Sequence, residues 1–191
     1  MRLVVTREDY FIAAMAILAE EGHGALKVAP LCRRVGVTTG SFYNYFGSLD
    51  GFIAELLPYW EQEQTDRLIR LASVRPEPRA RITALKDLAL KEIQHEAEAA
   101  IRAWANFNPE VYAAQQRVDT ERFDALVAVL RELIPHKRER DLLAVMGISL
   151  LSGYQAWRKP LDRRELSRVL DEYQRLLFDH ADLAERGLRG A

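Results

Sequence analysis

The sequence predicts an all-α protein of about nine helices, and three observations lead to this fold class. Apolar residues recur with helical period along nearly every segment, and no long segment alternates between apolar and polar residues as a half-buried strand does. Glycines and prolines stand between these segments, where helices commonly begin or end. The 191 residues, 49% hydrophobic and 29% charged, are typical of a globular protein with a buried core.

Residues 7–21 form the first predicted helix. Thr6 precedes it and belongs to the residue types that cap helices at their N-terminus. Gly22 follows it, and glycine accepts the left-handed backbone conformation that closes many helices. The apolar residues of this segment are spaced three and four apart, so they share one face. They are Tyr10, Phe11, Ala14, Ile17 and Leu18.

Two further short helices follow, with a tight turn between them. Residues 28–35 can be helical because Pro30 falls in the first turn, where its missing N–H is not needed. Gly36 ends this helix, and Thr38 caps the next one, which extends to about Tyr45. This order of helix, glycine turn and helix is the layout of a helix-turn-helix, whose second helix enters the major groove of DNA.

Six longer segments after residue 48 also have helical periodicity. Ser48 caps a long helix that Pro58 should kink or interrupt, because proline lacks the N–H that the helix needs. Two prolines, at positions 76 and 78, mark a linker after this helix. The charged run from His136 to Asp141 is most simply a polar loop. The segment over 142–157 is apolar around most of its circumference, so we expect it to be buried on all sides. The other predicted helices cover about residues 82–93, 97–107, 109–134 and 166–177.

The candidate DNA-binding residues lie at the start of the third predicted helix. A helix that reads the major groove needs small or hydrogen-bonding side chains near its N-terminus. Such residues are Thr38, Thr39, Gly40, Ser41, Tyr43, Asn44 and Tyr45. Phe42 and Phe46 are too apolar for exposure, and we expect them to hold this helix against the first and fourth helices. The alternative is that this run is only a loop and cap whose aromatic residues belong to the core.

Residues 7–57 resemble the N-terminal domain of the TetR family of bacterial transcriptional regulators. The matching elements, in chain order, are Ala13-Ala14, Leu18, Gly22, Gly36-Val37-Thr38, Gly40-Ser41-Phe42-Tyr43, Tyr45-Phe46 and Ser48. The resemblance implies a homodimer that binds a palindromic operator in double-stranded DNA through two reading helices about one DNA turn apart. It also implies a small-molecule effector, which releases the DNA from a protein that most often acts as a repressor.

Carried over by position, the resemblance assigns a phosphate contact to Lys27 and the contacts of the reading helix to six residues, Thr38, Thr39, Ser41, Tyr43, Asn44 and Tyr45. It implies a DNA-binding domain over residues 1–48 and a helical regulatory and dimerisation domain over residues 49–191, with the dimer made by the last two helices. Many family members carry a lysine where Leu49 stands. The alternative function is therefore a helical small-molecule-binding or protein-interaction module that no longer reads DNA.

Bulky or polar groups interrupt several of the apolar helices. A ligand pocket has a mostly apolar lining with a few polar groups, so these residues are candidates for its wall. The candidates are Trp60, Trp104, Asn106, Tyr112, Gln115 and Tyr154. Ordinary core packing is the alternative for each of them.

Several function classes have no residues to support them. The sequence contains no phosphate loop, dinucleotide fingerprint or nucleophile motif, so we expect neither an enzyme nor a bound cofactor. Cys32 is the only cysteine, which excludes an intrachain disulfide and a cysteine zinc site. Glu92, His95, Glu96 and Glu98 lie close together, and Glu92 with His95 or Glu96 has ligand spacing. A solvated acidic helix face is the preferred interpretation, and no metal site is predicted.

The sequence gives no indication of a membrane protein. The longest apolar stretch, over 142–151, is about half the ~20 residues that a membrane-spanning helix needs. The first residues become charged too early for a signal peptide. We therefore expect a cytoplasmic protein.

Overall fold

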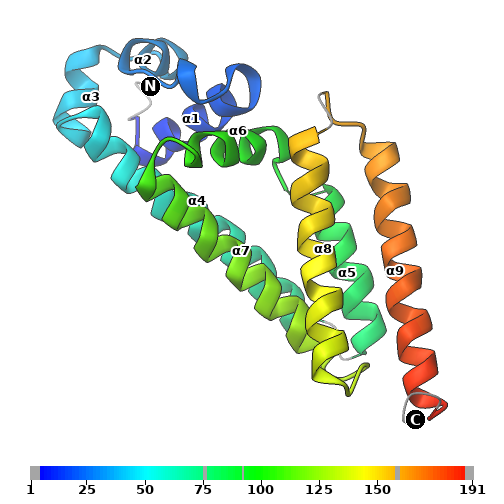
Figure 1. The fold of residues 1–191 in the computed structure, drawn as a ribbon. Helices are drawn as coiled ribbons and strands as arrows, with labels where there is room; N and C mark the ends of the chain where they lie inside the picture. Colours follow the sequence, from blue (N-terminus) through cyan, green and yellow to red (C-terminus); the bar gives the residue numbers. More distant parts are fainter. Residues whose placement is uncertain (1–4, 75–76, 92, 158–159, 188–191) are drawn as a thin grey trace. The chain divides into compact units, whose positions relative to one another are not determined.

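The computed structural model describes residues 5–74, 77–91, 93–157 and 160–187, and for 65–74 it describes the backbone alone. Within these residues the chain forms nine α-helices, one short 3-10 helix and no strand (Figure 1), which confirms the predicted all-α fold. The chain divides into two compact units, Met1–Glu63 with Gln94–Gln116 and Gln64–Ile93 with Arg117–Ala191. The border expected after residue 48 lies inside the first unit, so a functional division at that point stays a prediction.

The first unit begins with short helices whose ends are set by caps and glycines. The helices are α1 (Arg7–Glu21), η1 (His23–Ala25), α2 (Val28–Val35) and α3 (Thr39–Phe46). The bounds of α1 and α2 agree with the prediction. At the start of α1 the Thr6 hydroxyl accepts a hydrogen bond from the Asp9 N–H, and the Asp9 carboxylate accepts one from the Thr6 N–H at 2.7 Å. The backbone and hydroxyl hydrogen bonds from Thr6 lower the pKa of Asp9.

Three longer helices complete the first unit. They are α4 (Leu49–Val74), α6 (His95–Ala105) and α7 (Pro109–Leu130), of which α4 and α7 continue into the second unit. Ser48 caps α4 as predicted, because its hydroxyl accepts the Gly51 N–H at 2.9 Å. Of the two expected effects of Pro58, an interruption of this helix is wrong, since α4 continues through it, and a kink stays a prediction. Pro58 is exposed, so the carbonyl that loses its N–H partner lies on the side where water can replace it.

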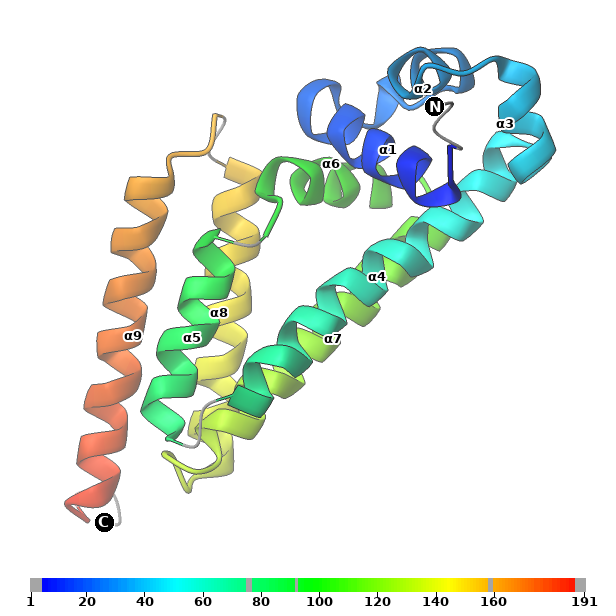
Figure 2. The ribbon, with the colours of Figure 1, turned by 180° about the vertical axis from the view of Figure 1, so that it is seen from behind.

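In the first unit α1 packs against α6, and both views of the ribbon show the two helices side by side (Figures 1 and 2). All five residues of the predicted apolar face of α1 are buried. Phe11 lies 5.7 Å from Phe52 and 5.0 Å from Tyr59 between ring centroids, so α1 is also packed on α4. The periodicity of the first helix was therefore sufficient to identify its buried face.

The second unit is a bundle that includes α5 (Pro78–Lys91), α8 (Lys137–Trp157) and α9 (Arg163–Glu185) (Figure 2). Its core is formed by aliphatic residues of these helices and of the second half of α7. They include Ile82, Leu126, Leu130, Leu143 and Leu177. The linker was expected over residues 75–78, of which 75 and 76 lie outside the described residues. Its last residue, Pro78, is instead the first residue of α5, a position where the missing N–H of proline is not needed. None of the described helices combines the length and apolar character needed to cross a bilayer.

Helix α8 differs from the prediction in where it begins and in how far it is buried. It begins at Lys137, where we expected a polar loop, because charged residues with high helix propensity are joined there by a Lys137–Asp141 ion pair. The Arg140 guanidinium also donates to the Ile134 carbonyl at 3.2 Å. Moreover, α8 is not buried on all sides in the single chain, since Leu142 is 61% exposed and Val145 is 51% exposed.

A close contact between α8 and α9 depends on Gly147. A Cβ atom at this position would lie 2.6 Å from the Tyr173 hydroxyl oxygen and 2.8 Å from ring carbon Cζ. Such distances require the helices or the ring to move, so we expect Gly147→Ala to lower the free energy of unfolding by about 1–3 kcal/mol. Urea titration measures this change, and in a Tyr173→Ala background the same substitution should have little effect.

Gly24→Ala is the matched control for this prediction, because an added Cβ there meets nothing within 4 Å. It should alter the free energy of unfolding by less than about 1 kcal/mol. Equal effects of Gly147→Ala and Gly24→Ala would show that the contact with Tyr173 does not limit the packing of these two helices.

Candidate nucleic-acid interface and cavity

Helix α3 is held in place by buried aromatic rings on its inner side. Phe42 is completely buried, and its ring centroid lies 5.9 Å from that of Tyr10 in an edge-on arrangement. Phe46 lies 5.2 Å from Tyr10 and 4.9 Å from Phe52 of α4. Phe42 and Phe46 therefore fix α3 to α1 and α4, as the sequence predicts.

The turn before α3 has the geometry that its glycine allows. Gly36 adopts a left-handed conformation with φ 79° and ψ 33°, which few residues other than glycine accept readily. The N–H groups of Gly36 and Val37 both donate to the Cys32 carbonyl, at 2.9 and 3.0 Å. The Thr38 hydroxyl then accepts the Ser41 N–H at 3.3 Å and caps α3. This turn directs the start of α3 outward.

Most of the predicted DNA-binding residues lie on the outer side of α3. We define the reader surface as the exposed residues Thr38, Thr39, Gly40, Tyr43 and Asn44. The Tyr43 side chain is the largest of them, and half of its surface is exposed. Small residues at the N-terminus of the helix and hydrogen-bonding residues one turn later leave room for a close approach to another molecule.

Ser41 and Tyr45 differ from the other predicted contacts because they are half-buried and their hydroxyls are used within the unit. The Tyr10 hydroxyl donates to the Ser41 oxygen at 3.3 Å. The Tyr45 hydroxyl donates to the Val5 carbonyl at 2.7 Å and so ties α3 to the segment before α1. Both residues hold α3 in position, and a direct contact from either of them to DNA stays a prediction.

Two of the four described basic residues in the first 48 positions form ion pairs, although all four are exposed. Arg7 bonds the Glu55 carboxylate at 2.8 Å and the Tyr45 carbonyl at 2.9 Å. Arg34 pairs with Glu20, and this hydrogen bond lowers the pKa of the Glu20 carboxyl. Lys27, the N-cap residue of α2, is exposed, as is Arg33. Sequence reasoning missed Arg33, although its place on a polar helix face was visible.

Leu49 is half-buried at the first position of α4, so this site offers no charge to a phosphate. Of the exposed basic residues that precede the reader surface on α2 and its cap, Arg34 is held by Glu20, which leaves Lys27 and Arg33 to offer positive charge to a phosphate. Their number is small, which agrees with the five Lys and Arg residues against four Asp and Glu residues over positions 1–48.

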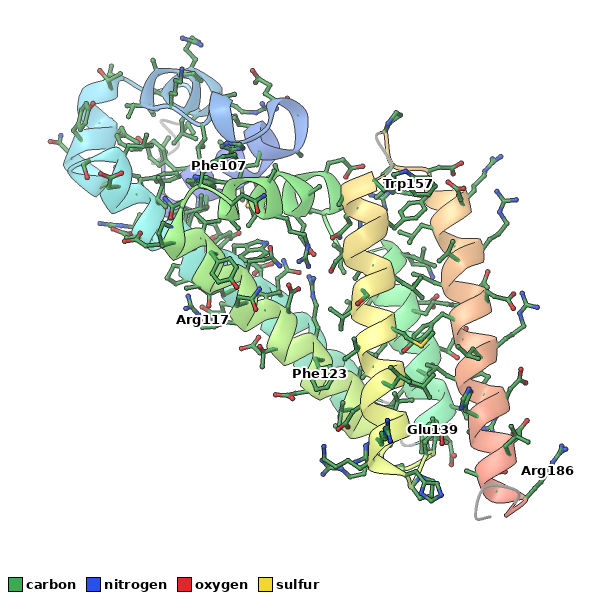
Figure 3. The ribbon with its side chains drawn as sticks, viewed as in Figure 1. Phe107, Arg117, Phe123, Glu139, Trp157 and Arg186 are labelled. Atoms are coloured by element: carbon green, nitrogen blue, oxygen red, sulfur yellow. The ribbon has the colours of Figure 1, made fainter. Side chains whose placement is uncertain are left out.

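A stack of rings connects η1 with the end of α6 in the first unit. The His23 ring lies 6.3 Å from Trp104, with 8° between the planes, and 6.2 Å from Phe107. Phe107 is 80% exposed and lies at the turn after α6 (Figure 3). Trp104 is thus part of a contact between helices, although the sequence suggested it for a ligand pocket.

A cavity of about 100 Å³ lies within the second unit, between α5, α7, α8 and α9. Its wall is mostly aliphatic, with residues such as Leu85, Leu88, Leu126, Ile148, Leu151 and Leu177. The polar groups in the wall come from Lys86, Arg122, Tyr173 and Gln174. Burial raises the pKa of Tyr173, so its hydroxyl stays protonated, and it donates to the Leu143 carbonyl at 2.6 Å.

None of the six residues predicted to line a pocket belongs to the wall of this cavity. Trp60 of α4 and Gln115 of α7 are buried, and Tyr112 of α7 is 54% exposed. The Asn106 amide donates to carbonyls at the end of α6. The Tyr154 hydroxyl bonds the Asp162 carbonyl and the Glu165 carboxylate, each at 2.9 Å. Selecting residues by their bulk and polarity therefore identified groups that pack or cap helices, and not groups that line this cavity.

The acidic start of α6 is only partly the solvated face that the sequence suggested, since Glu96 alone of its described members is exposed as expected. His95 and Glu98 are buried, and Glu98 lies 3.2 Å from Arg102 one turn later. Glu92 lies outside the described residues. Among the residues that are described, no group of three His, Cys, Asp or Glu side chains is arranged to hold a metal ion.

Comparison with known proteins relates the helix-turn-helix to one family. Residues 12–56, which include α2 and α3, match the model described as "Bacterial regulatory proteins, tetR family". The HTH-type transcriptional regulator BetI of Stenotrophomonas maltophilia (strain R551-3) is 26% identical over 154 residues, which cover 77% of each chain. The reader surface thus falls within the segment that defines the match.

Solved structures share the fold along almost the whole chain. A transcriptional regulator from Rhodococcus sp. Rha1 superposes with a TM-score of 0.74 at 21% identity, over 92% of this chain and 97% of the other. A transcriptional regulator from Saccharomonospora viridis, solved in complex with choline, has a TM-score of 0.74 at 14% identity, over 87% and 94%. These likenesses extend the agreement in fold beyond the N-terminal helices.

Proposed function

We propose that this chain, which belongs to the tetR family of bacterial regulatory proteins, is a DNA-binding transcriptional regulator and acts as a repressor on a palindromic operator. The observation that carries this proposal is the two-sided character of α3. Buried rings hold one side rigidly on α1 and α4, while the reader surface leaves the other side open. A rigid, exposed helix with hydrogen-bonding groups is suited to the major groove.

The exposed cations support contacts to the DNA backbone. Lys27 precedes the first residue of α2, and Arg33 lies in its last turn. Both side chains are exposed, so phosphates can approach them without disrupting an ion pair of the kind that holds Arg34. Phosphate contacts supply much of the affinity and make it dependent on salt, whereas base contacts select the sequence.

An exposed apolar stripe on α8 supports a homodimer. We define the α8 stripe as Leu142, Val145, Met146 and Trp157, which are 61, 51, 38 and 72% exposed. Val145 and Met146 follow Leu142 by three and four residues and so share its helix face, and Trp157 lies at the C-terminal end of α8 (Figure 3). Apolar side chains gathered on one face of a helix commonly mark a protein–protein interface, and a twofold dimer would cover the same stripe in both subunits.

Replacing Val145 by glutamate should shift the protein from dimer to monomer, because the interface would then have to bury a charge without a partner. Sedimentation equilibrium measures the change, and we expect the dimer dissociation constant to rise at least tenfold. Ile12→Glu is the matched control, since Ile12 is similarly exposed at 55% but lies on α1. A dimer that survives Val145→Glu unchanged would place the subunit contact elsewhere.

A small-molecule effector completes the proposal. The neighbour from Saccharomonospora viridis binds choline, which supports a ligand-responsive role for the shared fold. In this chain the cavity of the second unit is the candidate site, because its wall is apolar and a few polar groups punctuate it. Binding there would stabilise the conformation of the bundle that does not hold operator DNA.

The matched family consists of regulatory proteins, and we extend this to the proposal that the chain catalyses no reaction and works in the cytoplasm. The single cysteine supports a compartment in which disulfides are not needed, and Cys32 is buried within α2. Incubation with common hydrolase and oxidoreductase substrates should therefore show no turnover above a protein-free blank.

A gel-shift competition tests the proposed function. The full chain is mixed with a labelled pool of random duplexes and increasing salt, with excess unlabelled nonspecific DNA as competitor. We expect binding that falls steeply with salt and a bound fraction that resists the competitor. Complete absence of DNA binding at low salt would favour the alternative, a helical module that binds small molecules or proteins. That alternative draws its support from the neutral Leu49 and the few exposed cations.

A further inference from the structure

We propose that the cavity of the second unit binds a compact, uncharged molecule that has an apolar ring or short chain and one hydroxyl group, as phenol has. This inference deepens the proposed function by naming the class of effector. The binding itself follows from the wall of the cavity, and only the release of DNA rests on the proposed function.

The size and lining of the cavity favour a small apolar body. About 100 Å³ is less than the roughly 150 Å³ that holds benzene in an apolar protein cavity, so one ring fits with slight movement of the wall. The lining is almost entirely carbon, supplied by aliphatic residues of four helices. Such a wall gains from contact with a ring or short chain and leaves no room for a long one.

The charged residues of the wall argue against a charged ligand. Lys86 is held by Asp171 at 2.6 Å, and the Arg122 guanidinium donates to the Gln64 side chain at 3.0 Å. The charge of Lys86 is thus already balanced by a carboxylate, and an anion would lose its own hydration against a wall that is almost entirely carbon. A cation meets no carboxylate among the described residues of the wall, and Tyr173 supplies the single ring rather than an aromatic cage.

A chain of hydrogen bonds determines which polar group the cavity offers. The Thr83 hydroxyl donates to the Arg79 carbonyl at 3.1 Å, so its oxygen is the acceptor for the Gln174 amide nitrogen at 2.7 Å. This arrangement fixes the orientation of the amide and leaves the Gln174 Oε1 atom as an acceptor on a residue of the wall. Tyr173 has already used its proton on the Leu143 carbonyl. The cavity therefore offers an acceptor, to which a ligand hydroxyl can donate.

Isothermal titration calorimetry with four probes on the full chain tests this inference. Phenol should bind saturably, and toluene, which has the same shape without the donor, should bind roughly two- to tenfold more weakly because one hydrogen bond is missing. Benzoate and choline should neither bind in this range nor displace phenol. Gln174→Met should remove the difference between phenol and toluene, while Gln62→Met, an exposed position on α4, should preserve it.

The outcomes separate the parts of the inference. No binding of phenol or toluene, or displacement of phenol by choline or benzoate, would overturn it. A phenol-to-toluene ratio that Gln174→Met leaves unchanged would overturn the role of the amide acceptor. Ile148→Trp should fill the cavity and abolish binding of both probes, and the Gln174 variant carries the test if that protein does not fold. Phenol binding by a chain that fails to bind any duplex would contradict the proposed function and leave the ligand inference intact.

Discussion

Replacing Tyr43 by alanine is expected to lower the affinity for the selected duplex by roughly 5- to 150-fold, which corresponds to about 1–3 kcal/mol. Tyr43 is the largest side chain of the reader surface and is half exposed, so its loss removes a DNA contact without opening the core. Fluorescence anisotropy with the selected duplex measures the affinity. Thr39→Ala should act in the same direction, because its exposed hydroxyl lies in the first turn of α3.

Tyr112→Ala is the matched control for Tyr43→Ala. Tyr112 has nearly the same exposure, 54% against 50%, but it lies on α7 and not on the reader surface. Both variants should melt within a few degrees of the parent protein. If Tyr43→Ala and Tyr112→Ala bind the duplex equally well, α3 does not read the DNA in the manner proposed.

Replacing Phe42 by alanine should lower the free energy of unfolding of the first unit by about 3–5 kcal/mol. Its ring is completely buried and contacts Tyr10 at 5.9 Å, Phe46 at 5.2 Å and Phe52 at 5.6 Å between centroids. Removal of this ring leaves a cavity where α1, α3 and α4 meet. Hydrogen exchange of backbone amides in α1 and α3 measures the loss within this unit.

Phe107→Ala provides the comparison for Phe42→Ala, since the Phe107 ring is 80% exposed and stacks on His23 at the surface of the first unit. Its substitution should change the free energy of unfolding by less than about 1 kcal/mol. Similar losses of protection in the two variants would contradict the view that the rings beneath α3 keep the reader surface rigid.

The short N-terminal helices could be predicted closely from sequence because their ends depend on single residues. Thr6 with Asp9, Gly22 and Gly36 set the bounds of α1 and α2 through local hydrogen bonds and backbone conformation. The same local chemistry identified Thr38 as the cap of α3. The burial of Phe42 and Phe46 also followed from their apolar character, and with it the outward direction of the reader surface.

The cavity could not be predicted in this way, because it depends on how four separate helices pack. In the sequence, Tyr173 and Gln174 are an ordinary part of the amphipathic α9. The need for a glycine at position 147 is apparent only from the structure, where the Tyr173 ring packs against it. Bulky and polar residues serve several purposes in helices. Gln115 is buried and Tyr112 is exposed, although the sequence suggested the same role for both.

Charge patterns were equally ambiguous without the structure. The charged residues at Lys137–Asp141 were expected to form a loop, yet an ion pair between them supports the first turn of α8. Glu98 was expected to be solvated, yet it is buried beside Arg102. In both places the charged residue pairs with a residue four positions away in the chain, and the two side chains meet only when the segment is helical.

Selection of duplexes from a random pool by the full chain is the most direct test of whether α3 reads DNA. We expect recovery of one palindromic sequence whose two half-sites are centred about one DNA turn, or roughly 10 base pairs, apart. The recovered duplex should bind the parent protein tightly and the Tyr43→Ala variant much more weakly. Recovery of no common sequence, or of one that both proteins bind equally, would contradict the assignment of α3 as the helix that reads DNA.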